Sequence, residues 1–238
     1  MPKRTWRIMF DSAVPFQEAW QTWLDRDGRE APEGWKPYAW ARYLGAGATD
    51  IADPLTTAEI EALLSEGMYL LPVYNNCTGN IVSKGSAQGA EEAKKAIALA
   101  DEIGVPDASY VALDLEHQWP LSAAFLEGWC DTMRQSRFAG SGMIYMQKEP
   151  WFDAPYTVAK PKNANVARAL LWDAYWTAVR WKPQDGVPAL VRLRAAIDRV
   201  AAWQFAGLGY IDVSAILAPV ESVGNVQEGL WGQPGVGK

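Results

Sequence analysis

Short apolar runs typical of β-strands alternate with helical segments along most of the chain, and this alternation constrains the fold more than any other feature. Most runs are apolar on both faces, as expected for parallel strands covered by helices. The predicted strands cover residues 6–10, 38–44, 68–74, 110–115, 142–146, 169–175, 200–205 and 210–213. The predicted helices cover residues 14–24, 56–65, 89–103, 121–133 and 190–199, and Thr56 and Glu59 are expected to form a capping box.

The number of strand and helix units favours an α/β fold whose sheet closes into a single TIM-like barrel. An open doubly wound sheet is the alternative, although no Gly-rich phosphate loop follows the first strand, where a dinucleotide-binding fold would need one. The length of 238 residues fits one such domain. We therefore expect a barrel over residues 1–218 and a C-terminal tail over 219–238 that is packed on the barrel or mobile.

Charge, hydropathy and residue counts disfavour several classes of protein. The net charge of −6 and the scattered Lys and Arg residues argue against nucleic acid as a partner. No apolar run is long enough for a membrane span, and the start of the chain lacks a secretory signal. His117 is the single histidine, so we expect neither a metal nor a cofactor. Cys77 and Cys130 are interpreted as free thiols, with a disulfide as the alternative.

Acidic and polar side chains gather at the predicted carboxyl ends of the strands, where parallel barrels place their chemistry. These residues are Asp11, Asp114, Glu116, Asp173 and Gln204. Because Asp114 and Glu116 are two residues apart on a strand, their side chains point the same way, with Cα atoms about 6.6 Å apart. An acid in such an apolar strand is costly to bury, which points to pairing or chemistry. An ion pair between Asp114 and Arg42 is the structural alternative.

A carboxylate pair of this kind suits glycoside hydrolysis, which needs a proton donor at the leaving oxygen and a second negative group beside the sugar. We predict that Glu116 donates the proton and that Asp114 stays ionised. The thirteen tryptophans fit the same function, because flat sugar faces stack on aromatic rings. The residues predicted to bind substrate are Tyr74, Trp119, Tyr145, Asp173, Trp176, Trp203 and Gln204.

Four segments spread over nearly the whole chain carry short acidic and aromatic motifs. They are Met9-Phe10-Asp11, Ala112-Leu113-Asp114-Leu115-Glu116, Leu171-Trp172-Asp173-Ala174-Tyr175-Trp176, and Trp203-Gln204-Phe205 followed by Gly209-Tyr210-Ile211-Asp212. Together they resemble the glycoside hydrolase family 25 lysozymes and the related glycoside-hydrolase-like (Rv2525c-like) domains. The resemblance implies a barrel of five strand and helix units plus three further strands that cleaves the muramic acid linkage of peptidoglycan. By position, it also implies that Glu116 is the acid, Asp114 its partner, and Asp11 and Asp212 the outer carboxylates.

Three functions fit these observations. The first is a peptidoglycan muramidase, assisted by the substrate's acetamido group, that acts at the cell wall after release or as part of a phage particle. The second is a noncatalytic glycan-binding or virion-structural barrel. The third is a hydrolase of another glycan, or a divalent-metal enzyme that uses Asp114, Glu116 and His117. The expected partner is peptidoglycan or a related glycan, and the localisation and oligomeric state stay open.

Overall fold

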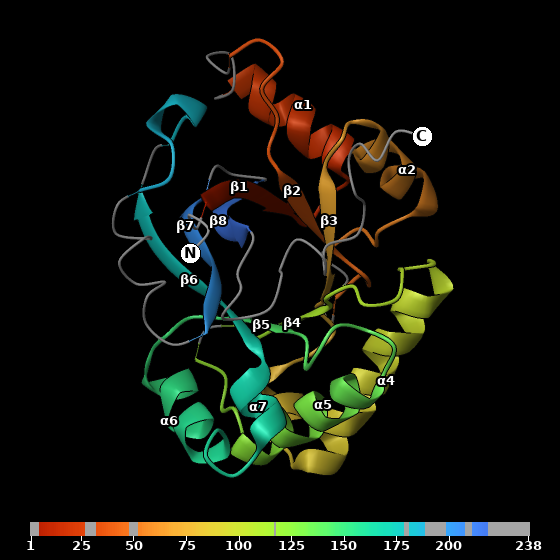
Figure 1. The fold of residues 1–238 in the computed structure, drawn as a ribbon, viewed down its shortest axis with the longest axis vertical. Helices are drawn as coiled ribbons and strands as arrows, with labels where there is room; N and C mark the ends of the chain where they lie inside the picture. The colour runs from red at the N-terminus through yellow and green to blue at the C-terminus, as the bar shows by residue number, and fades with distance from the viewer. Residues whose placement is uncertain are drawn as a thin grey trace.

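The computed structural model describes residues 5–26, 32–47, 52–116, 118–178, 181–188, 199–207 and 211–218. In these residues eight strands close into a barrel in chain order (Figure 1). The strands are β1 (Thr5–Ser12), β2 (Ala39–Tyr43), β3 (Tyr69–Tyr74), β4 (Ala112–Asp114), β5 (Met143–Met146), β6 (Leu170–Ala178), β7 (Val200–Gly207) and β8 (Asp212–Ala218). The predicted TIM-like α/β barrel is therefore confirmed, and the alternative of an open sheet is wrong.

The last strand differs from the prediction in length and direction. β1 to β7 pair in parallel, whereas β8 runs antiparallel to both β7 and β1. β7 ends at Gly207 and β8 begins at Asp212, a connection too short for the crossover that parallel strands need. β8 extends well beyond the predicted 210–213 because its later apolar residues complete the core between β7 and β1.

Helices cover the outside of the barrel, and at least one follows each of the first five strands, as the five predicted units require (Figure 1). They are α1 (Phe16–Arg26), α2 (Thr57–Ser65), α3 (Gly79–Val82), α4 (Ser86–Glu102), α5 (Ala123–Gln135), α6 (Pro150–Ala159) and α7 (Ala164–Arg168). The prediction lacks α3, α6 and α7. α6 carries two prolines, yet Pro150 lies in its first turn, where no backbone N–H needs a partner. The predicted helix at 190–199 lies almost entirely outside the described residues, and the tail at 219–238 lies wholly outside them.

The core has two layers because successive strand residues alternate between the barrel interior and the surrounding helices. Met9 and Ala112 belong to the inner layer. Their chain neighbours Phe10 and Leu113 pack in the outer layer with helical residues such as Trp129. A strand residue's position in this alternation therefore decides whether its side chain reaches the barrel interior.

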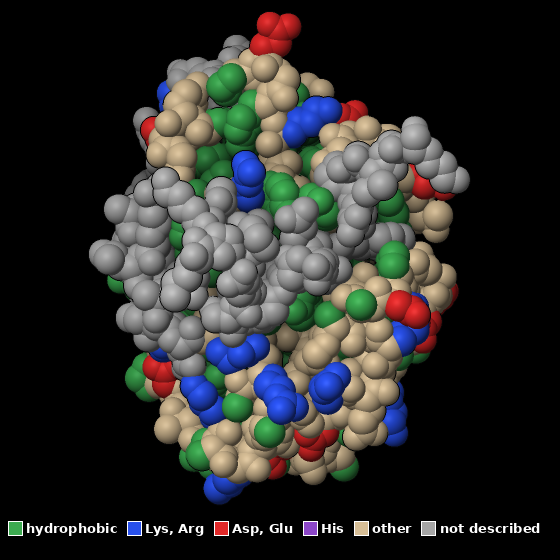
Figure 2. Space-filling model, viewed as in Figure 1, with side chains coloured by type: hydrophobic (Ala, Val, Ile, Leu, Met, Phe, Trp, Pro, Cys, Tyr) green, Lys and Arg blue, Asp and Glu red, His purple; other side chains and the backbone are tan. Residues whose placement is uncertain are grey.

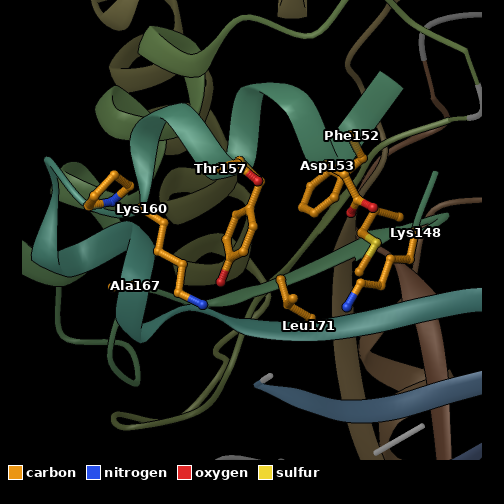
Figure 3. A pocket seen from close by; sticks show the side chains of 10 residues that line it. Lys148, Phe152, Asp153, Thr157, Lys160, Ala167 and Leu171 are labelled. Atoms are coloured by element: carbon orange, nitrogen blue, oxygen red, sulfur yellow. The ribbon is translucent and has the colours of Figure 1, made fainter. Parts of the chain in front are cut away.

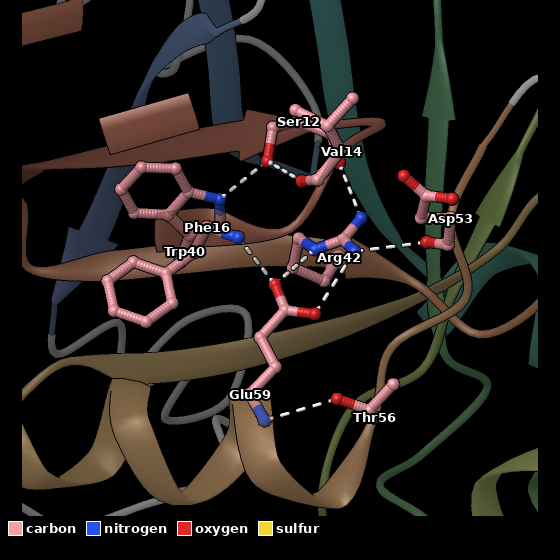
Figure 4. A network of polar contacts seen from close by, with 8 residues as sticks. All are labelled: Ser12, Val14, Phe16, Trp40, Arg42, Asp53, Thr56 and Glu59. Atoms are coloured by element: carbon pink, nitrogen blue, oxygen red, sulfur yellow. Dashed lines mark hydrogen bonds and ion pairs between the residues drawn. The ribbon is translucent and has the colours of Figure 1, made fainter. Parts of the chain in front are cut away.

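A buried ion pair fixes the carboxyl end of β1 (Figure 4). Arg42 of β2 contacts Glu59 of α2, with 2.6 Å between Nε and Oε1, and donates a hydrogen bond to the Ser12 carbonyl oxygen at 2.9 Å. Glu59 also accepts from the backbone N–H of Phe16 at 2.7 Å. Thr56 caps α2 by accepting from the Glu59 N–H at 3.2 Å. The predicted capping box is thus only half formed, because the Glu59 carboxylate is bound to Arg42.

The expectations about the cysteines and the membrane can be compared with the structure directly. Cys77 and Cys130 are both buried and free, so the prediction of free thiols is confirmed and the disulfide alternative is wrong. Burial raises the pKa of each thiol, which favours the unreactive protonated form. Within the described ranges, no helix has the length and apolar character needed to cross a bilayer.

Candidate active site

Four acidic side chains come together at the carboxyl end of the parallel strands. Asp11 lies near the end of β1 and is in register with Asp212 at the start of β8. Asp114 ends β4, and Glu116 follows two residues later. The residues two positions before Asp11 and Asp114 belong to the inner core layer, so both carboxylates point toward the barrel axis. All four predicted carboxylates interact electrostatically, which places them in one cluster.

The three aspartates of this cluster have raised pKa values. Burial raises the pKa of Asp11 well above its usual range, and the charges of Asp212 and Asp114 add to the effect. Burial, and then the charge of Glu116, raises the pKa of Asp114. Burial and Glu116 raise the pKa of Asp212 to about 6, against the opposite effect of Gln204. These three aspartates therefore retain protons at pH values where isolated carboxyl groups have lost them.

Two carboxylate oxygens of the cluster are buried without a protein partner. Asp11 Oδ2 and Asp114 Oδ1 accept no hydrogen bond from any residue in the described part of the chain. The alternative in which Arg42 neutralises Asp114 is wrong, because Arg42 is bound to Glu59. Burial, and then the charge of Glu116, raises the pKa of Asp114, so the predicted ionised state of this carboxyl group is opposed by its surroundings. Glu116 itself is exposed, so a ligand can reach it.

Side chains from three further strands border the carboxylates. Tyr145 of β5 donates a hydrogen bond to Gln204 of β7, with 2.5 Å between Oη and Oε1. This bond orients the amide of Gln204, which interacts with Asp212. Tyr43 at the end of β2 is not among the predicted residues, yet burial and the surrounding carboxylates raise its pKa. Tyr43 lies two residues beyond Ala41, whose side chain faces the barrel interior, so the alternation along the strand could have identified it.

Three residues predicted to bind substrate lie away from this cluster. Tyr74 is fully buried and donates a hydrogen bond to Glu92 of α4, with 2.5 Å between the oxygens. Trp203 is 1% exposed and donates from Nε1 to a backbone carbonyl of β6 at 3.2 Å. Asp173 is fully buried and accepts from the backbone N–H of Lys148 at 2.9 Å. Their polar atoms bind protein groups in or beside the outer layer, so these side chains do not point toward the carboxylates.

The remaining predicted residues lie in or next to segments that the structure describes only in part. Trp119 is half-buried and packs against the outer core layer in the loop after β4. Its neighbour Gln118 has a φ of 61°, a left-handed conformation that is costly for a non-glycine residue and is often found at functional sites. The side chain of Trp176 lies outside the described residues, as does His117, which a metal-based mechanism would use.

The raised pKa of Asp212 predicts a pH-dependent gain of stability in Asp212→Asn. A carboxyl group whose pKa is higher in the folded than in the unfolded chain stabilises the fold at low pH, and this contribution is lost as the pH rises through about 6. We therefore expect Asp212→Asn to raise the free energy of unfolding by about 1–3 kcal/mol at pH 8, with little difference near pH 4. Urea denaturation at the two pH values measures this, and an equal change at both would contradict the prediction.

A closed α/β barrel with carboxylates at the carboxyl ends of its strands is the architecture of glycoside-hydrolase-like proteins. Residues 36–208 match the model of the Rv2525c-like, glycoside hydrolase-like domain, and the chain belongs to this family. The matched range contains Asp114, Glu116 and Gln204, whereas Asp11 and Asp212 lie outside it. No curated protein matches the sequence.

Solved structures with the same fold overlap most of the chain. An uncharacterized B. stearothermophilus protein is 22% identical, with a TM-score of 0.77 over 94% of this chain and 100% of that one. The Mycobacterium tuberculosis Tat-secreted protein Rv2525c, solved with HEPES, is 14% identical, with a TM-score of 0.57 over 94% of this chain and 98% of that one. The Clostridium perfringens spore cortex lytic enzyme SleM is 12% identical, with a TM-score of 0.53 over 91% of this chain and 68% of that one. These similarities agree with the barrel described above.

Proposed function

We propose that this chain is a glycoside hydrolase that cleaves peptidoglycan at the muramic acid linkage. The observation that carries the proposal is the carboxylate cluster, in which buried oxygens of Asp11 and Asp114 have no hydrogen-bond partner among the described residues. Such groups are costly to bury and are kept where a ligand or a reaction uses them. Family membership supports a glycan substrate, as does the fold shared with a spore cortex lytic enzyme.

Glu116 is the proposed proton donor, because its exposed carboxyl group can meet a glycosidic oxygen at the mouth of the barrel. Asp114, once ionised, accepts the N–H of the sugar's acetamido group. The acetamido oxygen then bonds to C1 while the glycosidic bond breaks and the Glu116 proton passes to the leaving oxygen. Glu116 next takes a proton from water, which opens the cyclic intermediate. The anomeric configuration is retained.

Digestion of purified peptidoglycan tests this proposal. We expect the intact chain to release new reducing ends, and the masses of the fragments to show muramic acid at the reducing terminus. Fragments ending in glucosamine would instead indicate a glucosaminidase. Cleavage within the peptides, or no release of reducing ends, would contradict a muramidase. Measuring fragment mass and reducing ends in one sample identifies the bond and shows turnover.

A noncatalytic glycan-binding barrel, including one in a virion, is the second candidate. The raised pKa values of Asp11 and Asp114 favour it, because protonated carboxyl groups can hydrogen-bond sugar hydroxyls without taking part in a reaction. This candidate predicts that the chain sediments with purified cell walls while no reducing ends appear. It also predicts that Glu116→Gln leaves the amount of sedimented chain unchanged.

A further inference from the structure

A pocket of about 650 Å³ lies on the outside of the barrel, bordered by α6, α7 and β6 (Figure 3). Its volume falls within the range of about 300–1,000 Å³ that is usual for small-molecule sites. Met146, Phe152 and Leu171 contribute apolar surface. No residue of this pocket belongs to the carboxylate cluster, so it is a separate candidate site.

Two lysines lie at opposite ends of this pocket. Figure 3 shows the amines of Lys148 and Lys160 well apart along α6, both on the side of Leu171. Lys148 is half-buried, and among the described residues its amine takes part in no ion pair. An ammonium group beside an apolar wall is costly without a counter-ion, so the pocket favours a ligand that brings negative charge.

The surrounding surface agrees with this preference. The chain as a whole has a net charge of −6, which would repel an anion. Figure 2 nevertheless shows Lys and Arg side chains gathered on the part of this face where α7 lies in Figure 1. The local positive charge therefore favours anions at the pocket despite the negative net charge of the chain.

The shape of the pocket limits the length of its ligand. The lining residues extend along α6 from Phe152 to Lys160. Eight residues of helix rise about 12 Å, which is the length of three to four residues of extended peptide. A ligand that fills the pocket would therefore be short, with carboxylates near its ends and small apolar groups between them. Asp153, on the same wall, can pair with an amine of the ligand.

We propose that this pocket binds the short acidic peptide that peptidoglycan carries on muramic acid, an inference that rests on the proposed function. That peptide contains alanine methyl groups, glutamate and other carboxylates, and usually one amine, which match the apolar wall, the two lysines and Asp153. The pocket and the carboxylate cluster lie on opposite sides of β5. Tyr145 borders the cluster from inside the barrel, and the next residue, Met146, lines the pocket from outside. A glycan at the mouth would reach the pocket by passing its peptide over the end of β5.

Calorimetric titration of the free tripeptide L-Ala-γ-D-Glu-L-Lys into the full chain tests the inference without any turnover. We expect saturable binding that Lys148→Met and Lys160→Met each weaken about five- to tenfold, because Met keeps the apolar stem and removes the charge. Lys162→Met is the matched control, since Lys162 is exposed next to the pocket without lining it, and it should leave the affinity unchanged. The same tripeptide with amidated carboxylates should bind at least fivefold more weakly.

Equal affinity for the amidated tripeptide, or unchanged affinity in both pocket variants, would overturn the inference. The two experiments distinguish a pocket that does not bind the peptide from a chain that does not cleave peptidoglycan. Tripeptide binding without digestion of cell walls would refute only the muramidase. Digestion without tripeptide binding would refute only the pocket. If both hold, Lys148→Met should raise KM more for walls that carry peptides than for glycan strands stripped of them.

Discussion

Glu116→Gln should lower the rate of reducing-end release from purified peptidoglycan at least about 100-fold, within the range of roughly 10²–10⁴ that general acid catalysis supplies. Gln keeps the length and shape of the side chain and can still donate a hydrogen bond, but it has no acidic proton to transfer. Because Glu116 is exposed, the substitution should leave the packing of the barrel unchanged. The far-ultraviolet circular dichroism should therefore match that of the wild type, and the thermal midpoint should not fall.

Glu61→Gln provides the matched control for this experiment. Glu61 is an exposed glutamate of α2, distant in sequence from β4, and its replacement makes the same change in net charge. We expect its rate to equal that of the wild type. If Glu116→Gln digests cell walls as fast as Glu61→Gln, Glu116 is not the proton donor. The role would then pass to one of the buried carboxyl groups, whose raised pKa values also suit an acid.

Glu59→Gln should destabilise the fold by about 3–5 kcal/mol, the cost of leaving one partner of a buried ion pair uncompensated. Arg42 is fully buried and Glu59 is 3% exposed, so water cannot replace the lost charge. The same substitution disturbs the group that accepts the Phe16 N–H at the start of α1. Because Arg42 also donates a hydrogen bond to the Ser12 carbonyl oxygen, the substitution should make the end of β1 next to Asp11 more mobile. Urea denaturation at pH 7 measures the change.

Glu66→Gln is the control for this prediction, since it breaks a salt bridge of the same type at the surface. Glu66 pairs with Lys36, and both side chains are more than two-fifths exposed. Exposed pairs of this kind contribute less than about 1 kcal/mol. If Glu59→Gln lowers the free energy of unfolding no more than Glu66→Gln does, the buried pair does not stabilise the barrel.

The structure brings predicted site residues together where the prediction depended on local spacing or on the ends of strands that face the barrel interior. Asp114 and Glu116 lie two residues apart, so an extended chain brings them together in any fold. Tyr74 ends β3 and Trp203 lies within β7, and both side chains point into or beside the outer layer rather than toward the carboxylates. Strands that are apolar on both faces lack the alternating pattern that would show which side faces the barrel interior. Tyr43 was missed for the same reason.

The order of the eight strands, and hence the class of barrel, was determined by the sequence alone, because apolar runs are local properties of the chain. Only the tertiary structure decided the raised pKa of Asp114 and the partner of Arg42. Both depend on burial and on charges from other strands, which no local pattern records. The register that sets Asp11 beside Asp212 likewise exists only because the barrel closes between its first and last strands.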